Sequence, residues 1–143
     1  MNRVKNKAAL ITGGASGLGL ASGKQLLKEG AKVIFTDIDE AQLENIKDQI
    51  DNEFTESFST KLLDVTDEEN WKSVLSESVD ELGGLNILLN SAGITLGADI
   101  VSTSFDIWKK VHDVNLDGVF LGCKHALPLM SQSGLGSIIN LSS

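Results

Sequence analysis

The sequence predicts an α/β fold in which helices cover both faces of a doubly wound parallel sheet. Three observations support this prediction. Short apolar segments alternate with helix-like segments along all 143 residues. The apolar segments carry hydrophobic residues at consecutive positions, as strands buried on both faces require. A glycine-rich turn follows the first apolar segment, at the place where an open parallel sheet binds phosphate groups.

Five strands and four helices are expected along the chain. The apolar runs place the strands at 7–12, 31–36, 57–63, 85–89 and 136–141. Apolar residues at helical spacing place the helices at 17–29, 39–51, 67–82 and 104–131. Gly30 and Gly83 are placed to end the first and third helices. Asp67 or Thr66 would cap the third helix, and Pro128 is expected to interrupt the last one near its end. Strands joined through helices form right-handed crossovers, so we expect one parallel sheet in a single domain spanning 1–143.

The composition is that of an ordinary soluble globular protein, with 41% hydrophobic and 22% charged residues. The net charge of −8 and the lack of a Lys/Arg cluster argue against nucleic-acid or anionic-membrane partners. No apolar run approaches the ~20 residues of a membrane span. The single cysteine, Cys123, fits a reducing cytoplasm, where we expect the protein to lie. His112 and His125 are far from any Cys/His cluster, so we expect no metal site and interpret both as surface or packing residues.

The turn from Thr12 to Gly19 has the sequence TGGASGLG. Glycines let a pyrophosphate approach backbone N–H groups, and the start of the next helix adds unpaired N–H groups and a positive dipole end. A plain structural turn would use glycine as well. Asp37 ends the second strand at close to the ~20-residue spacing expected of an acid that binds the adenosine ribose. Strand, glycine turn, helix, strand and acid in this order favour a dinucleotide site of the Rossmann type.

The acid at the end of the second strand also bears on the choice of cofactor. A carboxylate at Asp37 would accept both ribose hydroxyls and repel a 2′-phosphate. No Arg or Lys lies between Thr36 and Ala41, which favours NAD over NADP. The structural alternative is that Asp37 caps the next helix, although Asp39 could do that instead.

Three further polar positions stand at strand ends or inside a helix. Asp64 ends the third strand and could accept a hydrogen bond from an adenine amino group or cap the next helix. Asn90-Ser-Ala-Gly93 ends the fourth strand, where small residues would let the chain pass close to a nicotinamide ribose or form a plain turn. Asn115 lies inside the predicted long helix, where asparagine is unfavourable. It is either a surface residue, or a site of a kink or of a hydrogen-bonded water.

Five motifs occur in register along the whole chain. They are Thr12-Gly-x-x-x-Gly-x-Gly19, Asp64-Val-Thr, Asn90-Ser-Ala-Gly93, Asn115 and Ile139-Asn-Leu-Ser-Ser143. Together they resemble the short-chain dehydrogenase/reductase family. The segments ALITGGASGLGL, VFLGCK and GSIINLSS are most similar to bacterial NAD-linked 3β/17β-hydroxysteroid dehydrogenases within it. One departure is Ser91, where the family usually has a second asparagine, and we expect a minor effect on the hydrogen bonds of that loop.

The resemblance implies a role for each matched position. The cofactor-binding residues would be those of the pyrophosphate turn, the adenine and ribose contacts after the second and third strands, and the loop after the fourth: Gly13, Ser16, Gly17, Leu18, Gly19, Asp37, Ile38, Asp64, Val65, Asn90, Ala92 and Gly93. The catalytic residues would be Asn115, which holds a water in a proton relay, and Ser143, which hydrogen-bonds the reacting carbonyl or hydroxyl. The implied reaction is NAD-dependent hydride transfer between a secondary alcohol and a ketone, with a hydroxysteroid as one candidate substrate.

The chain contains no tyrosine. The resemblance implies a Tyr-x-x-x-Lys pair on the helix after the fifth strand, where the tyrosine serves as general acid/base. We therefore expect the sequence to be the N-terminal portion of a longer enzyme, with its sheet truncated after the fifth strand, and to be inactive alone. Two alternatives are a non-catalytic NAD-binding sensor or scaffold and a 3-oxoacyl thioester reductase, which usually prefers NADPH. The family's counterpart of helix 104–131 implies a homo-oligomer, a dimer or tetramer, although part of its apolar face could pack on the chain's own core.

Overall fold

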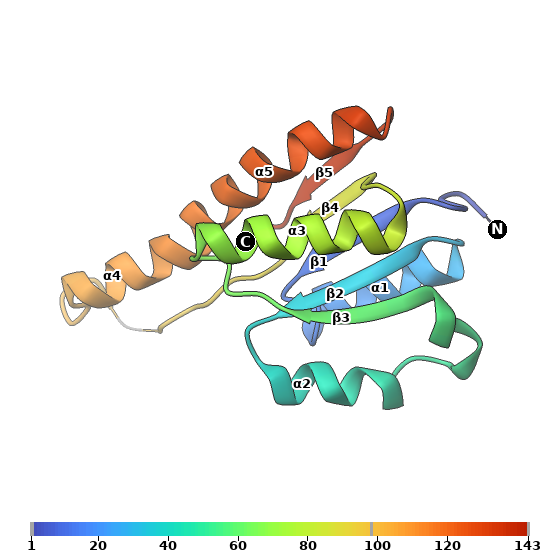
Figure 1. The fold of residues 1–143 in the computed structure, drawn as a ribbon. Coiled ribbons are helices and arrows are strands. Elements are labelled where there is room, and N and C mark those ends of the chain that lie inside the picture. Colours follow the sequence, from blue (N-terminus) through green and yellow to red (C-terminus); the bar gives the residue numbers. More distant parts are fainter. Residues whose placement is uncertain (1, 98, 143) are drawn as a thin grey trace.

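The computed structural model describes residues 2–97 and 99–142. Their backbone forms a parallel sheet of five strands in the order β3-β2-β1-β4-β5 (Figure 1). The strands are β1 (Ala8–Thr12), β2 (Lys32–Asp37), β3 (Phe58–Leu62), β4 (Ile87–Asn90) and β5 (Ser137–Asn140). The α/β fold with a doubly wound parallel sheet is thus confirmed, with each strand within two residues of its predicted ends.

Helices cover both faces of this sheet. Helices α1 (Gly17–Lys28) and α2 (Glu40–Glu44) lie on one face, and α3 (Glu68–Leu82) and α5 (Gly118–Gln132) lie on the other (Figure 1). Successive strand residues face opposite layers: Ile11 of β1 packs with the α1 and α2 side, whereas its neighbour Leu10 packs with the α3 and α5 side. This two-sided burial explains why the central strands are apolar at every position.

The predicted second helix, 39–51, is wrong in its length. Helix α2 ends at Glu44 and is followed by two 3-10 segments, Asn45–Asp48 and Asn52–Ser57. Leu43, Ile46 and Ile50 are nevertheless buried. The apolar spacing was therefore a correct guide to burial, while the short polar residues between them favour tight turns over a continuous α-helix.

The last predicted helix spans the expected stretch but is not uniform. Helix α4 (Phe105–His112) leads into a π-helical segment, Asp113–Asp117, which continues as α5. The predicted interruption at Pro128 is wrong, since α5 runs through that residue to Gln132. The irregularity lies instead around Asn115, which the unfavourable helix propensity of asparagine had indicated. A π segment of this kind often marks a functional position.

Capping residues mark both ends of helix α3. Asp67 accepts hydrogen bonds from the N–H groups of Glu69 and Asn70, so it is the cap of α3 and Thr66 is not. Gly83 ends α3 with a φ of 78°.

Within the described residues, no helix is both long and apolar enough to cross a membrane.

Candidate functional site

The carboxyl ends of four strands meet at one edge of the sheet. Thr12 lies level with Thr36 of β2 and with Asn90 of β4, and Asn90 lies level with Asn140 of β5. Between β1 and β4 the chain reverses the direction in which it adds strands, and such a switch point leaves a crevice at the carboxyl edge. All of the predicted site residues that the structure describes lie on segments that leave this edge, or on the π segment that reaches it.

The glycine turn fills the space between the ends of β1 and β4. Gly13 has a φ of +60°, and a Cβ there would lie 2.8 Å from the Cα of Ala92. A Cβ on Gly19 would collide with the carbonyl oxygen of Gly13. Only glycine satisfies these two positions, because the backbone of the turn packs directly on itself and on the loop after β4.

The start of α1 offers backbone donors at this edge. Ser16 is the N-cap residue, and no side-chain hydrogen bond caps the helix within the described structure. Gly17 faces open space among the described residues, and Leu18 beside it is 70% exposed. The unpaired N–H groups and the positive dipole end are what a pyrophosphate requires. The residues present therefore fit the phosphates of a dinucleotide.

Asp37 at the end of β2 faces the glycine turn. Its Oδ2 accepts a hydrogen bond from the Ala15 N–H at 3.2 Å, and its Oδ1 accepts one from the Asp39 N–H at 3.2 Å. Asp39 caps α2 by accepting a bond from the Gln42 N–H at 3.0 Å. The structural alternative for Asp37, a cap of α2, is therefore excluded. Ile38, the predicted adenine neighbour, is 67% exposed.

Thr12 is a further residue at this edge of the sheet, and the sequence motifs alone give it no role. Its side-chain oxygen accepts hydrogen bonds from the N–H groups of Ser91 at 3.1 Å and Ala92 at 3.0 Å. The residue is 1% exposed, so these bonds are shielded from water. Thr12 thereby fixes the loop after β4 against the glycine turn. The sequence indicates this role only through a hydroxyl residue at the end of an otherwise apolar strand, directly before the first glycine.

Asn90 points into the protein. Its Nδ2 donates to the Oδ1 of Asn140 at 2.9 Å, which joins the ends of β4 and β5, and the residue is 3% exposed. Its buried Oδ1 has no hydrogen-bond partner in the described structure and faces Gly122 of α5. Of the predicted ribose contacts after β4, the half-buried Ala92 and the exposed Gly93 are therefore the accessible ones.

Asp64 and Val65 lie in the turn between β3 and α3. The Oδ1 of Asp64 accepts bonds from the N–H and the hydroxyl of Thr66, at 2.9 and 2.7 Å. Asp64 is therefore not the cap of α3 but closes a local turn of its own. Val65 is buried, and its carbonyl oxygen accepts the indole N–H of Trp71 at 2.9 Å.

Asn115 in the π segment binds the loop after β4. Its Oδ1 accepts from the Ile94 N–H at 2.8 Å, and its Nδ2 donates to the Ile94 carbonyl oxygen at 2.9 Å. The interpretation of Asn115 as an ordinary surface residue is therefore wrong, because its amide pairs with this backbone as a neighbouring strand would. The predicted catalytic Ser143 lies outside the described residues.

A charged cluster joins the two helices beside the site. Glu68 at the start of α3 accepts hydrogen bonds from Lys124 at 2.7 Å and His125 at 2.8 Å, both on α5. These bonds, that of Lys124 first, lower the pKa of Glu68 from 4.5 to about 2. His125 is thus part of a helix–helix contact. Among the described residues no group of His, Cys, Asp and Glu could hold a metal ion.

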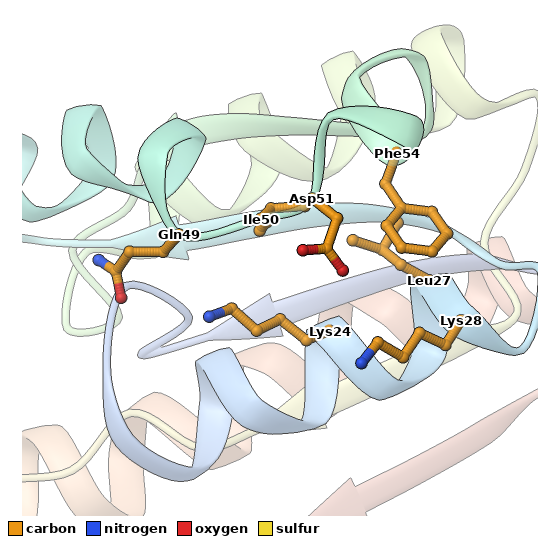
Figure 2. Close-up of a pocket in the computed structure, with 7 residues that line it drawn as sticks. All are labelled: Lys24, Leu27, Lys28, Gln49, Ile50, Asp51 and Phe54. Atoms are coloured by element: carbon orange, nitrogen blue, oxygen red, sulfur yellow. The ribbon is translucent and has the colours of Figure 1, made fainter.

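A separate pocket lies away from this edge, between α1 and the segment 49–54 (Figure 2). Lys24 and Lys28 of α1 lie on one side of it and Gln49 and Asp51 on the other, and the apolar Leu27, Ile50 and Phe54 also line it. Its volume of about 160 Å³ is below the roughly 300–1,000 Å³ of typical ligand sites. None of the motif residues lines it, so it is not a candidate for the dinucleotide.

Comparison with known proteins agrees with this geometry. The sequence profile described as short chain dehydrogenase matches residues 7–143. The chain is 42% identical over 142 residues to 2,5-dichloro-2,5-cyclohexadiene-1,4-diol dehydrogenase of Sphingobium indicum, covering 99% of this chain and 56% of that protein. It is 41% identical over 142 residues to 3-beta-hydroxysteroid dehydrogenase of Comamonas testosteroni, covering 99% of this chain and 54% of that protein.

A third relative is 3-alpha-(or 20-beta)-hydroxysteroid dehydrogenase of Mycobacterium tuberculosis, 38% identical over 141 residues, which cover 99% of this chain and 53% of that protein. The chain spans about half the length of the curated relatives it matches. The profile match and these identities both extend over nearly the whole sequence. The chain therefore belongs to the short-chain dehydrogenase family.

Proposed function

We propose that this chain is the cofactor-binding domain, residues 1–143, of an NAD(H)-dependent oxidoreductase that interconverts a secondary alcohol and a ketone. The observation that carries the proposal is the carboxylate of Asp37, which stands beside the glycine turn and caps no helix. In this position it can accept both hydroxyls of an adenosine ribose and repel a 2′-phosphate. The sequence from Thr36 to Ala41 offers no cation that would compensate such a phosphate.

The remaining contacts of the chain would hold the cofactor and the reacting group. The start of α1 would bind the pyrophosphate, and the loop after β4, fixed by Thr12 and Asn115, would lie under the nicotinamide ribose. When bound, the nicotinamide supplies the hydride donor or acceptor. We propose Asn115 and Ser143 as the catalytic residues of this chain, with Asn115 holding a water for proton transfer and Ser143 binding the reacting oxygen.

The substrate class follows from the relatives and from the loop after β4. The names of the three relatives give a cyclohexadiene diol and hydroxysteroids as their substrates. In this chain the loop after β4 exposes apolar side chains at Leu96, Ile100 and Val101. We propose a cyclic secondary alcohol with an apolar ring body, such as a hydroxysteroid.

The assembly that we propose is a cytoplasmic homo-oligomer, a dimer or tetramer. Phe105 and Trp108 on α4 and Phe120 on α5 are exposed, at 73, 49 and 60%. Burial of this apolar face by the chain's own core, the alternative interpretation, does not account for these three residues. Large exposed aromatic side chains along one helical stretch favour contact with a second copy.

A second candidate function is a non-catalytic NAD sensor or scaffold, which would use the same glycine turn and Asp37. The presence of both Asn115 and Ser143 favours the enzyme instead, because a pure binding module needs neither residue. A 3-oxoacyl thioester reductase, the other alternative, usually prefers NADPH, which Asp37 disfavours.

The test uses the full-length protein with NADH and NADPH and a panel of cyclic ketones and 3-oxoacyl thioesters. We expect kcat/KM with NADH to exceed that with NADPH, and the cyclic ketones to be the better substrates. Replacement of Asp37 by Ala should weaken NADH binding, while Asp39→Ala, which removes a neighbouring carboxylate, is the matched control. Preference for NADPH, or equal NADH binding by the two variants, would contradict the proposal.

A further inference from the structure

We propose that Asp37 is also a positioning residue that holds the phosphate-binding turn in place before any nucleotide arrives. The inference rests on the proposed function only for the identity of the ligand. It concerns the N–H of Ala15, which lies in the middle of the turn and donates to the Asp37 carboxylate.

Two successive amides of the turn are bound to the end of β2. The Gly14 N–H donates to the Thr36 carbonyl oxygen at 2.8 Å, and the Ala15 N–H donates to the Oδ2 of Asp37 at 3.2 Å. The first acceptor is backbone and survives any substitution. The second is a side chain, so the residue chosen at position 37 decides whether the Ala15 N–H has a partner.

The other side of the turn is already fixed. Gly13 packs on Ala92, and Thr12 binds the N–H of that same residue. The turn is therefore held between the loop after β4 and the end of β2. Ala15 is 3% exposed, and a buried N–H without a partner is costly. Loss of the Asp37 carboxylate would leave the turn bound to β2 through the Gly14–Thr36 hydrogen bond alone.

The Asp37 carboxylate can hold the turn and bind the adenosine ribose at the same time. A carboxylate has about four lone-pair directions, and two of them are used by the N–H groups of Ala15 and Asp39. The remaining ones are free for ribose hydroxyls. Replacing Asp37 to admit a 2′-phosphate would therefore also loosen the pyrophosphate site. A cofactor switch at this position should cost affinity even for ligands that have no adenosine.

The experiment uses full-length protein and reduced nicotinamide mononucleotide, which carries a phosphate but no adenosine ribose, with binding followed by its fluorescence. We expect Asp37→Ala to weaken its binding by roughly tenfold, as for loss of one hydrogen bond to a charged group. Hydrogen exchange of the Ala15 amide in the unliganded protein should become faster by a similar factor, while the Gly14 amide is unchanged and reports intact folding. Asp37→Asn keeps one acceptor oxygen, which can serve either the Ala15 or the Asp39 N–H, so it should restore both quantities only in part.

The outcomes separate this inference from the proposed function. If Asp37→Ala weakens NADH but leaves mononucleotide binding and Ala15 exchange unchanged, Asp37 acts on the ribose alone and the positioning role is overturned. If Ala15 exchange and mononucleotide binding change while the wild-type protein prefers NADPH, the positioning role stands and the proposed cofactor is wrong.

Discussion

The side-chain amide of Asn115 forms two hydrogen bonds with the backbone of Ile94, one as acceptor from the N–H at 2.8 Å and one as donor to the carbonyl at 2.9 Å. A helix residue thus pairs with an irregular loop in the way that one strand pairs with another. The π segment Asp113–Asp117 presents the amide at this place. Loop and helix are thereby held as one unit at the carboxyl edge of the sheet.

Replacement of Asn115 should detach the loop after β4 from the π segment. We expect Asn115→Ala to lower kcat of the full-length protein by roughly ten- to a hundredfold, since two hydrogen bonds to the loop are lost. Asn115→Asp keeps the acceptor but places a carboxylate against the Ile94 carbonyl, so it should not restore activity. The Ile94 amide, whose acceptor is the Asn115 Oδ1, should exchange faster with solvent in Asn115→Ala. An unchanged kcat together with faster exchange would show that the contact is structural only.

The buried hydroxyl of Thr12 should matter for stability as well as for cofactor binding. Thr12→Val keeps the shape but leaves the Ser91 and Ala92 N–H groups without their acceptor. We expect the free energy of unfolding in urea to fall by about 2 kcal/mol and the KM for NADH to rise. Thr12→Ser retains the oxygen and serves as the control. The prediction fails if the Val and Ser variants unfold at the same urea concentration.

The contact of Glu68 with Lys124 and His125 should make part of the stability depend on pH. The pKa of Glu68 is lowered from 4.5 to about 2 in the folded protein. Its contribution is therefore fully present above about pH 4.5 and is lost as the pH falls toward 2. We expect Glu68→Gln to lower Tm relative to wild type at pH 7, with a smaller difference at pH 3. Glu69→Gln is the control, because its bond to Lys72 lies within α3. A Tm difference that is constant with pH would contradict the role of this carboxylate.

The self-packing of the glycine turn gives a steric prediction. A methyl group on Gly19 would collide with the Gly13 carbonyl oxygen, whereas one on Gly97 would meet no described atom within 4 Å. We expect Gly19→Ala to abolish measurable NADH binding and to lower Tm by several degrees. Gly97→Ala should leave both unchanged. Calorimetric binding and thermal unfolding of the two variants provide the measurement, and normal NADH affinity in Gly19→Ala would refute the packing argument.

Local patterns predicted most of this fold, and contacts between distant segments account for what they missed. The strand Ala8–Thr12 is apolar at nearly every position, so its two-sided burial was visible in the sequence. Polar residues between 45 and 57 compete with helix formation, and the spacing of the apolar residues does not reveal this competition. The partner of Thr12 lies 79 residues away at Ser91, and no local pattern contains that distance. The sequence shows that Asn115 is unfavourable inside a helix, but its partner Ile94 is evident only from the folded backbone.

The absence of tyrosine from the chain leads to the last prediction. Proton transfer to the reacting oxygen requires a group with a suitable pKa within hydrogen-bond reach. Neither Asn115 nor Ser143, the proposed catalytic residues of this chain, is a general acid or base of this kind. We therefore expect the isolated 143-residue polypeptide to bind NADH through the glycine turn but to reduce no ketone, whereas the full-length protein does both. Circular dichroism would verify that the polypeptide is folded, and NADH fluorescence and absorbance would follow binding and turnover. Ketone reduction by the isolated polypeptide would show that a residue within this chain supplies the proton.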